Sequence, residues 1–154
     1  MKVSLNWLKD YVDFDLDLEH LKERFSTQSQ EVDRAYHMVE ATGLVVGHTL
    51  KCEKHPNADK LSVCDVDVKD EVLTIICGAP NISANQKVIV AKPGAVLPGN
   101  FKIKKAKLRG VESYGMICSL NELGIEEKYH HETGIHVLSE DAPVGEDALK
   151  ALGY

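Results

Sequence analysis

Residues 61–77 read LSVCDVDVKDEVLTIIC and predict a β-hairpin. From Leu61 to Asp67 the residues fall into two alternating sets, as expected of a strand whose two faces meet different surroundings. The polar segment Lys69-Asp70-Glu71 is typical of a turn, and it leads into a second extended run, Val72–Cys77. This hairpin is the point from which the rest of the chain can be assigned.

Further short extended runs lie on both sides of the hairpin. They are Leu44–Glu53, Lys87–Lys92, Lys102–Arg109, Tyr114–Cys118 and Gly134–Leu138. Pro-Gly pairs at 93–94 and 98–99 mark loops, a helical turn is expected at Asn121–Leu123, and a closing helix at Gly145–Leu152. Short strands at this spacing, separated by Gly and Pro loops, indicate a small barrel or sandwich.

The first forty residues have a helical pattern instead. Ser4 is expected to cap one short amphipathic helix and Asp17 a second one. Two such helices bury too little apolar surface to be stable alone. We therefore expect this segment to pack on the rest of the chain or on something absent from it.

The overall composition is that of an ordinary folded domain. The chain has 154 residues, of which 44% are hydrophobic and 27% charged, and this excludes disorder. No apolar run approaches the roughly 20 residues that a membrane-spanning helix needs. The four cysteines are widely separated, with no Cys-x-x-Cys pair, as expected of reduced thiols in a cytoplasmic protein.

Charge is distributed unevenly along the chain. The net charge of −6 divides into −4 for residues 1–40, +4 for residues 41–119 and −6 for residues 120–154. Salt screens exposed charges beyond roughly 8 Å, so phosphate binding depends on the local potential. An acidic chain can therefore bind RNA, but only through its middle part.

The segment Lys102–Arg109 holds five cations and no anion in eight residues. The alternation of apolar and basic residues in this segment is interrupted at Lys104-Lys105. A β-bulge there would turn Ile103, Ala106 and Leu108 toward the core and leave a basic outer face that could follow a phosphate backbone. The alternative is a solvated strand, or an edge strand protected from aggregation by its lysines.

Aromatic residues near this segment are few. Only Phe101 and Tyr114 flank it, and base stacking is a main source of affinity for single-stranded RNA. Recognition of the shape and phosphates of a structured RNA fits better than sequence-specific binding.

The loop His55–Leu61 also admits two interpretations. Pro56 fixes an extended entry and its Asn and Asp favour turns, so the side chains could serve only to cap backbone groups. Alternatively, His55 and Lys60 extend the basic surface.

Catalytic and metal sites have little support. Cys77 precedes a turn, and no His or Asp spacing completes a triad with it. The cluster His130, His131 and His136 lacks a Cys pair or a helical His-x-x-x-His motif, which argues against zinc. Met116, judged by residue type alone, favours the core.

Six separated motifs appear in order and together carry a resemblance. They are the run His55–Leu61, Cys77-Gly78-Ala79-Pro80-Asn81, Lys107-Leu108-Arg109-Gly110, Ser113-Tyr114-Gly115-Met116, Cys118-Ser119 and Glu122-Leu123-Gly124. From about Val39 to Ala148 the chain closely resembles the tRNA-binding OB-fold module that several aminoacyl-tRNA synthetases share with free-standing tRNA-binding proteins. The opening Lys2-Val3-Ser4-Leu5-Asn6-Trp7-Leu8, with Tyr11-Val12, is similar to the amino terminus of bacterial phenylalanyl-tRNA synthetase β subunits.

This resemblance implies a mainly β fold with flanking helices (α+β), in which a five-stranded OB-type barrel is joined to a small amino-terminal helical segment. Residues 1–38 would be half of a split domain, residues 39–148 the OB-fold domain, and residues 149–154 the start of a returning segment completed beyond Tyr154. The expected RNA-binding residues are Lys102, Lys104, Lys105, Lys107, Arg109, His55, Lys60, Ser113, Tyr114 and Met116.

The resemblance also implies a cellular context. The whole enzyme would be an (αβ)₂ heterotetramer in the cytoplasm that uses ATP and Mg²⁺ to attach phenylalanine to tRNA. The partners would be tRNA, the α subunit and the rest of the β subunit, with no membrane and no DNA. The fragment itself would hold no cofactor, metal or catalytic residue, because the active site lies in the α subunit.

Two alternatives remain at this point. One is a structural OB-fold module that serves synthetase assembly and binds little RNA of its own. The other is a free-standing homodimeric tRNA-binding protein, against which the extension Met1–Val39 argues.

Overall fold

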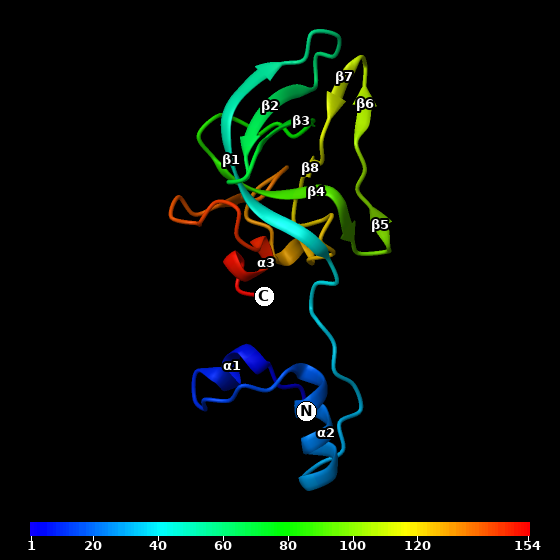
Figure 1. Ribbon diagram of the computed structural model, residues 1–154, viewed down its shortest axis with the longest axis vertical. Coiled ribbons are helices and arrows are strands. Elements are labelled where there is room, and N and C mark those ends of the chain that lie inside the picture. The colour runs from blue at the N-terminus through cyan, green and yellow to red at the C-terminus, as the bar shows by residue number, and fades with distance from the viewer. The chain divides into compact units, whose positions relative to one another are not determined.

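The computed structural model describes residues 1–154 and contains two units, Met1–Met38 and Val39–Tyr154 (Figure 1). The larger unit is built on an antiparallel sheet with strand order β3-β2-β1-β4-β5, and β8 and β9 also pair with β4. A separate two-stranded sheet is formed by β6 and β7. The strands are β1 (Thr42–Lys54), β2 (Ser62–Asp67), β3 (Val72–Cys77), β4 (Lys87–Leu97), β5 (Phe101–Lys102), β6 (Ala106–Leu108), β7 (Val111–Ser113), β8 (Met116–Ile117) and β9 (Val137–Leu138).

The sheet curls into a barrel because its two long strands bend. Strand β1 pairs with β2 along one half and with β4 along the other, and its register shifts between Thr49 and Lys51. At Gly47 the strands approach so closely that a Cβ atom would lie 2.5 Å from a Val90 methyl carbon and 2.6 Å from one of Val66. Only glycine therefore allows this approach.

The barrel is joined between β3 and the segment 111–117. The Tyr114 amide donates to the Thr74 carbonyl at 2.8 Å, and the Ile76 amide donates to Ser113 Oγ at 3.1 Å. Segment 111–117 in turn reaches β4 through β8. The strands thus form a curled antiparallel sheet, which confirms the expected mainly β, OB-like fold.

Two apolar clusters fill the larger unit. One lies between the β2–β3 hairpin and β4 and includes Val66, Ile75 and Val88. The other joins β1 and β4 to residues 118–125 and to helix α3 (Ala148–Ala151). The short 3₁₀ helix η1 (Glu127–Tyr129) lies in the intervening loop. The larger unit therefore has an apolar core on either side of its β1–β4 pairing.

Helix α3 is shorter than the predicted helix over 145–152. Asp147 caps it by accepting from the amides of Leu149 and Lys150, and Leu149 and Leu152 pack against the core. Position 149 thus lies within a helix of the barrel unit. That residues 149–154 begin a returning segment stays a prediction.

The smaller unit contains helices α1 (Leu5–Lys9) and α2 (Leu18–Gln28). Ser4 and Asp17 cap them as predicted, by accepting from the Trp7 and His20 amides respectively. Neither helix buries any residue, and the Trp7 side chain is 74% exposed. This agrees with the expectation that the two helices lack packing of their own.

The prediction of one continuous strand over 102–109 is wrong. Ile103 is buried as expected, because its backbone still pairs with Gly94 and Ala95 of β4. The chain then leaves the sheet and forms the β6–β7 hairpin. Both Ala106 and Leu108 are consequently exposed, whereas a bulged strand would have turned them inward.

The predicted strand over 114–118 is also interrupted. Strands β7 and β8 flank Gly115, which has a φ of +122°. A Cβ atom at this position would lie 2.5 Å from the Ala91 carbonyl oxygen. The interruption at glycine lets the chain pass from the hairpin back onto β4.

Candidate nucleic-acid interface

The cations of the predicted basic segment gather on one connection of the barrel, residues 101–113, which we call the basic hairpin. Its strands β6 and β7 pair from Ala106–Ser113 to Leu108–Val111. The two-residue turn Arg109-Gly110 has positive φ at both positions, as a tight hairpin requires. Lys102, Lys104, Lys105, Lys107 and Arg109 are all exposed. Figure 1 shows the hairpin, whose strand β7 lies beside β3.

One of these cations has an internal partner. Lys105 Nζ lies 3.0 Å from the Glu112 carboxylate and 4.6 Å from the centre of the Tyr114 ring. The Tyr114 hydroxyl donates to the same carboxylate at 2.8 Å. The hydrogen bonds from Tyr114 and then Lys105 lower the pKa of Glu112, and Tyr114 and then Glu112 raise the pKa of Lys105. Both groups therefore stay charged at neutral pH.

The other four cations of the hairpin form no ion pair. Lys102, Lys104, Lys107 and Arg109 lie on the exposed surface without a carboxylate within 4.0 Å. Lys107 is paired through the backbone with Glu112 across the hairpin. The acidic segment 120–154 does not neutralise any of them, so a phosphate can approach.

His55 is buried beneath this hairpin. It is 4% exposed, its Nε2 lies 3.1 Å from the Leu108 carbonyl oxygen, and its Nδ1 accepts from the Asn57 amide at 3.0 Å. Asn57 Nδ2 also donates to the Arg109 carbonyl at 3.2 Å. The expectation that His55 extends the basic surface is thus corrected: the loop side chains bind backbone, and they tie loop 55–61 to the hairpin.

Two other predicted contact residues serve the barrel itself. Ser113 is 3% exposed, and its hydroxyl accepts from Ile76 and donates to the Gly115 carbonyl at 3.1 Å. Met116 is half-buried in β8 and packs against the core. Ser113 is therefore too buried to contact RNA, whereas Met116 is partly exposed and remains a candidate contact.

The remaining candidates are accessible. Lys60 is exposed in loop 55–61, and Tyr114 is half-buried under Lys105. Phe101, which the sequence placed only as a neighbour of the basic run, is 60% exposed on β5. An exposed aromatic ring beside Lys102 can stack on a base.

No catalytic or metal centre accompanies this surface. Cys77 ends β3 as a buried thiol, and burial raises its pKa, which disfavours the nucleophilic thiolate. His130 Nε2 lies 2.7 Å from the Ile125 carbonyl oxygen, so this ring is used for structure. No three His, Cys, Asp or Glu side chains converge as metal ligands do. In addition, none of the helices is of a length and hydrophobicity that would let it cross a bilayer.

A comparison with known protein families agrees with the tRNA-binding interpretation of this fold and its exposed cations. The family model described as a putative tRNA binding domain matches residues 44–147, which is most of the barrel unit. The chain belongs to this tRNA-binding domain family. The match includes both the basic hairpin and loop 55–61.

Individual relatives extend the similarity to the smaller unit. A phenylalanine–tRNA ligase beta subunit of Halalkalibacterium halodurans is 55% identical over 158 residues, which is 99% of this chain and 20% of that protein. The Bacillus subtilis phenylalanine–tRNA ligase beta subunit is 54% identical with the same coverage. The chain thus spans about one fifth of the length of these relatives. The resemblance to this subunit is confirmed.

A solved structure shows a weaker likeness. The MetRS-related protein from Pyrococcus horikoshii is 26% identical and covers 66% of this chain and 84% of its own, with a TM-score of 0.47.

Proposed function

We propose that this chain is the tRNA-binding accessory module of a phenylalanine–tRNA ligase β subunit and that the basic hairpin makes its main contacts with tRNA phosphates. The observation that carries the proposal is the set of four exposed hairpin cations without an ion pair. Phe101 and the outer face of Tyr114 would add limited stacking. Binding of this kind depends on shape and charge, not on base sequence.

The position of the hairpin in the barrel supports this proposal. OB-folds bind oligonucleotides with the face of their second and third strands and with the loops that follow strands one and four. Here loop 55–61 follows β1, and the basic hairpin begins in the connection that follows β4. The hydrogen bonds of His55 and Asn57 hold these two loops together. The cations therefore stand where this fold places its ligand.

The similarity to the ligase subunits suggests the wider role. In the whole enzyme the module would aid the ATP- and Mg²⁺-dependent attachment of phenylalanine to tRNA, within a cytoplasmic (αβ)₂ heterotetramer. Its partners would be tRNA, the α subunit and the rest of the β subunit. Because no group in this chain fits a metal or a nucleophile, we assign no step of the reaction to it. Since the match covers 99% of the chain, the helical unit is included, which favours the ligase over a free-standing protein.

We also propose that residues 1–38 form half of a domain that a later segment completes. Helices α1 and α2 bury no residue, and Trp7 and Tyr11 are exposed. Residues 149–154 would begin the segment that returns to them. An aromatic surface of this kind is normally covered in a folded protein.

One observation favours a second candidate, a structural module with little RNA binding of its own. Lys105 is paired with Glu112, and His55 and Ser113 are committed to internal hydrogen bonds. Three of the ten expected contact residues are therefore already occupied. In that case the barrel would serve subunit assembly.

A tRNA titration of this chain at two or more salt concentrations separates the two candidates. If about three phosphates are neutralised, log K should fall with log salt with a slope near −2. Replacing Lys104, Lys105 and Lys107 by Glu should weaken binding at least tenfold while the fold is kept. Lys150→Glu, on exposed α3, is the matched control and should leave the affinity unchanged. A triple variant that binds tRNA as tightly as the parent chain would favour the structural module.

A further inference from the structure

A hollow of about 360 Å³ lies beside loop 55–61. Three elements form it: the end of β1 with Lys54, the loop and start of β2 from Asp59 to Ser62, and the segment that follows β3 from Gly78 to Ile82. None of its lining residues belongs to the hairpin itself. The hollow is therefore a separate feature of the surface.

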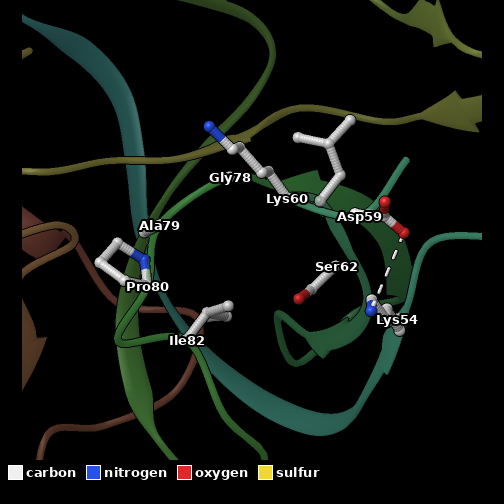
Figure 2. Close-up of a pocket in the computed structure, with 9 residues that line it drawn as sticks. Lys54, Asp59, Lys60, Ser62, Gly78, Ala79, Pro80 and Ile82 are labelled. Carbon is white, nitrogen blue, oxygen red and sulfur yellow. Dashed lines mark ion pairs between the residues drawn. The ribbon is translucent and has the colours of Figure 1, made fainter.

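Two polar side chains of the hollow have no hydrogen-bond or ion-pair partner within the chain. The Ser62 hydroxyl makes no hydrogen bond, and Lys60 forms no ion pair, whereas Lys54 lies 3.9 Å from the fully exposed Asp59. Figure 2 shows Ser62 pointing toward the centre of the ring of residues, with the Lys54–Asp59 pair at one side. The Asp59 carboxylate also lines the hollow but is paired with Lys54, so the Ser62 hydroxyl and the Lys60 ammonium are the groups left for an anionic ligand group such as a phosphate.

The opposite side of the hollow is apolar. Pro80 and Ile82 stand there in Figure 2, across from Ser62, and Leu61 and Ala79 also line the hollow. A flat ring placed against such a wall loses contact with water while a phosphate remains at the polar rim. Ligand pockets start at roughly 300 Å³, so the volume admits one small ligand and no more. Together these properties fit one nucleotide, with its base on the wall and its phosphate at Lys60.

Loop 55–61 links the hollow to the hairpin. His55 and Asn57 of this loop bind the Leu108 and Arg109 carbonyls, and Lys60 and Leu61 of the same loop line the hollow. The backbone of the loop is itself closed by the His55 amide donating to the Leu61 carbonyl at 2.9 Å. An RNA strand on the hairpin needs to cross only this one loop to reach the hollow.

We propose that the hollow between β1, loop 55–61 and the segment after β3 is a binding site for a nucleoside monophosphate unit, which an RNA held on the basic hairpin supplies as an unstacked nucleotide. This inference rests on the proposed tRNA binding. Lys60 and Ser62 hold the phosphate, and Pro80 and Ile82 contact the base. The apolar wall makes no hydrogen bonds to base edges, so all four bases fit.

Two variants test the site by different means. Gly78→Leu fills the hollow. Gly78 does not have a positive φ, and its Cβ would meet a Leu61 methyl carbon at 3.3 Å, which must shift slightly, and the Lys60 carbonyl oxygen at 4.0 Å. Lys60→Gln removes one charge and keeps a polar, unbranched side chain. Ala84→Leu, an exposed position of the same connection outside the hollow, and Lys150→Gln are the matched controls. Thermal melts of all four chains establish that the fold is kept.

The measurements are tRNA affinity against salt concentration and the amide NMR shifts of the chain during titration with AMP. We expect Gly78→Leu to weaken tRNA binding about tenfold through the lost base contact. Lys60→Gln should make the slope of log K on log salt shallower by about 0.7, the change for one phosphate contact. AMP should shift the amides of Ser62, Gly78 and Ala79 in the parent chain and not in Gly78→Leu.

The outcomes separate this site from the hairpin. If AMP shifts these amides but Gly78→Leu leaves tRNA affinity unchanged, the hollow binds a free nucleotide, and its supply by an RNA on the hairpin is refuted. If AMP shifts nothing and both variants bind tRNA like their controls, while the triple hairpin reversal still abolishes binding, the site is refuted and the proposed function stands. If the triple reversal has no effect, the proposed function fails, and the supply of a nucleotide by RNA on the hairpin fails with it. The AMP titration then shows only whether the hollow binds a free nucleotide.

Discussion

The Lys105 ammonium and the Glu112 carboxylate lie 3.0 Å apart on the two strands of one hairpin. Glu112 is the only anion among the residues of the basic hairpin, and it stands directly opposite Lys107 in the strand pairing. The carboxylate therefore occupies a place where an RNA phosphate could otherwise pair with Lys105. It also keeps the Lys105 side chain over the Tyr114 ring, which covers a face that a base could use.

Replacing Glu112 by Gln should consequently strengthen tRNA binding. The change removes one negative charge from the hairpin and frees Lys105, and we expect roughly two- to fivefold tighter binding at low salt, the range of an exposed ion pair. The gain should shrink at high salt because these groups are exposed. Titrations of tRNA at two salt concentrations measure it. The control is Glu126→Gln, which removes the partner of Lys128 far from the hairpin in sequence; equal effects of the two variants would contradict a local competition.

Ser113 is predicted to act on stability alone. Its buried hydroxyl joins β3 to the segment 111–117 by accepting from Ile76 and donating to Gly115. Ser113→Ala leaves the buried Ile76 amide and the partly buried Gly115 carbonyl without this partner, which costs about 1–3 kcal/mol of the free energy of unfolding. Urea denaturation should show the loss, and Ser83→Ala, at an exposed position, should change stability by less than about 0.5 kcal/mol. Weaker tRNA binding by a folded Ser113→Ala chain would instead point to a direct contact.

Local sequence patterns were sufficient to predict much of the fold. The hairpin of β2 and β3, the caps Ser4 and Asp17 and the buried thiol of Cys77 depend on neighbouring residues, so alternation and residue type indicate them. The break after Ile103 does not have such a local cause. It arises because β4 pairs with the chain only as far as Ile103, and a distant strand, β7, then pairs with β6.

The candidate site was predicted only in part for the same reason. The five cations of segment 102–109 are close together in the sequence, so the sequence alone indicates a basic segment. The structure leaves all five exposed. The roles of His55 and Ser113 depend on carbonyls and amides 53 and 37 residues away, respectively, in the chain. The hollow beside Lys60 likewise combines three distant segments, and Glu112 became a partner of Lys105 only through the hairpin turn.

The lowered pKa of His136 predicts that the stability of the chain depends on pH. Burial lowers the pKa of its imidazole, and the nearby His131 and His130 add to this, whereas Glu132 opposes it. The unfolded chain, in which the pKa is about 6.5, therefore binds the proton more readily than the folded chain. By linkage the stability that neutral His136 contributes should be fully present above about pH 6.5, the pKa in the unfolded chain. The free energy of unfolding should fall as the pH drops below about 6.5, by at most about 1.4 kcal/mol per pH unit. Urea denaturation between pH 5 and 8 measures the slope, and His136→Gln should flatten it; an unchanged slope in this variant would exclude His136 as the cause.

Trp7 provides a direct test of the proposed half-domain. It is the single tryptophan of the chain and is 74% exposed on α1, so its fluorescence should be red-shifted and readily quenched by acrylamide. If residues 1–38 are completed by a segment that follows Tyr154, a longer chain carrying that segment should bury the indole, shift its emission to the blue and lower its quenching constant several-fold. The longer chain is compared with its Trp7→Phe variant, which keeps any later tryptophans. The difference between their fluorescence is the signal of Trp7. Equal quenching of Trp7 in the short and long chains would mean that its exposed face is not the surface by which the two halves join.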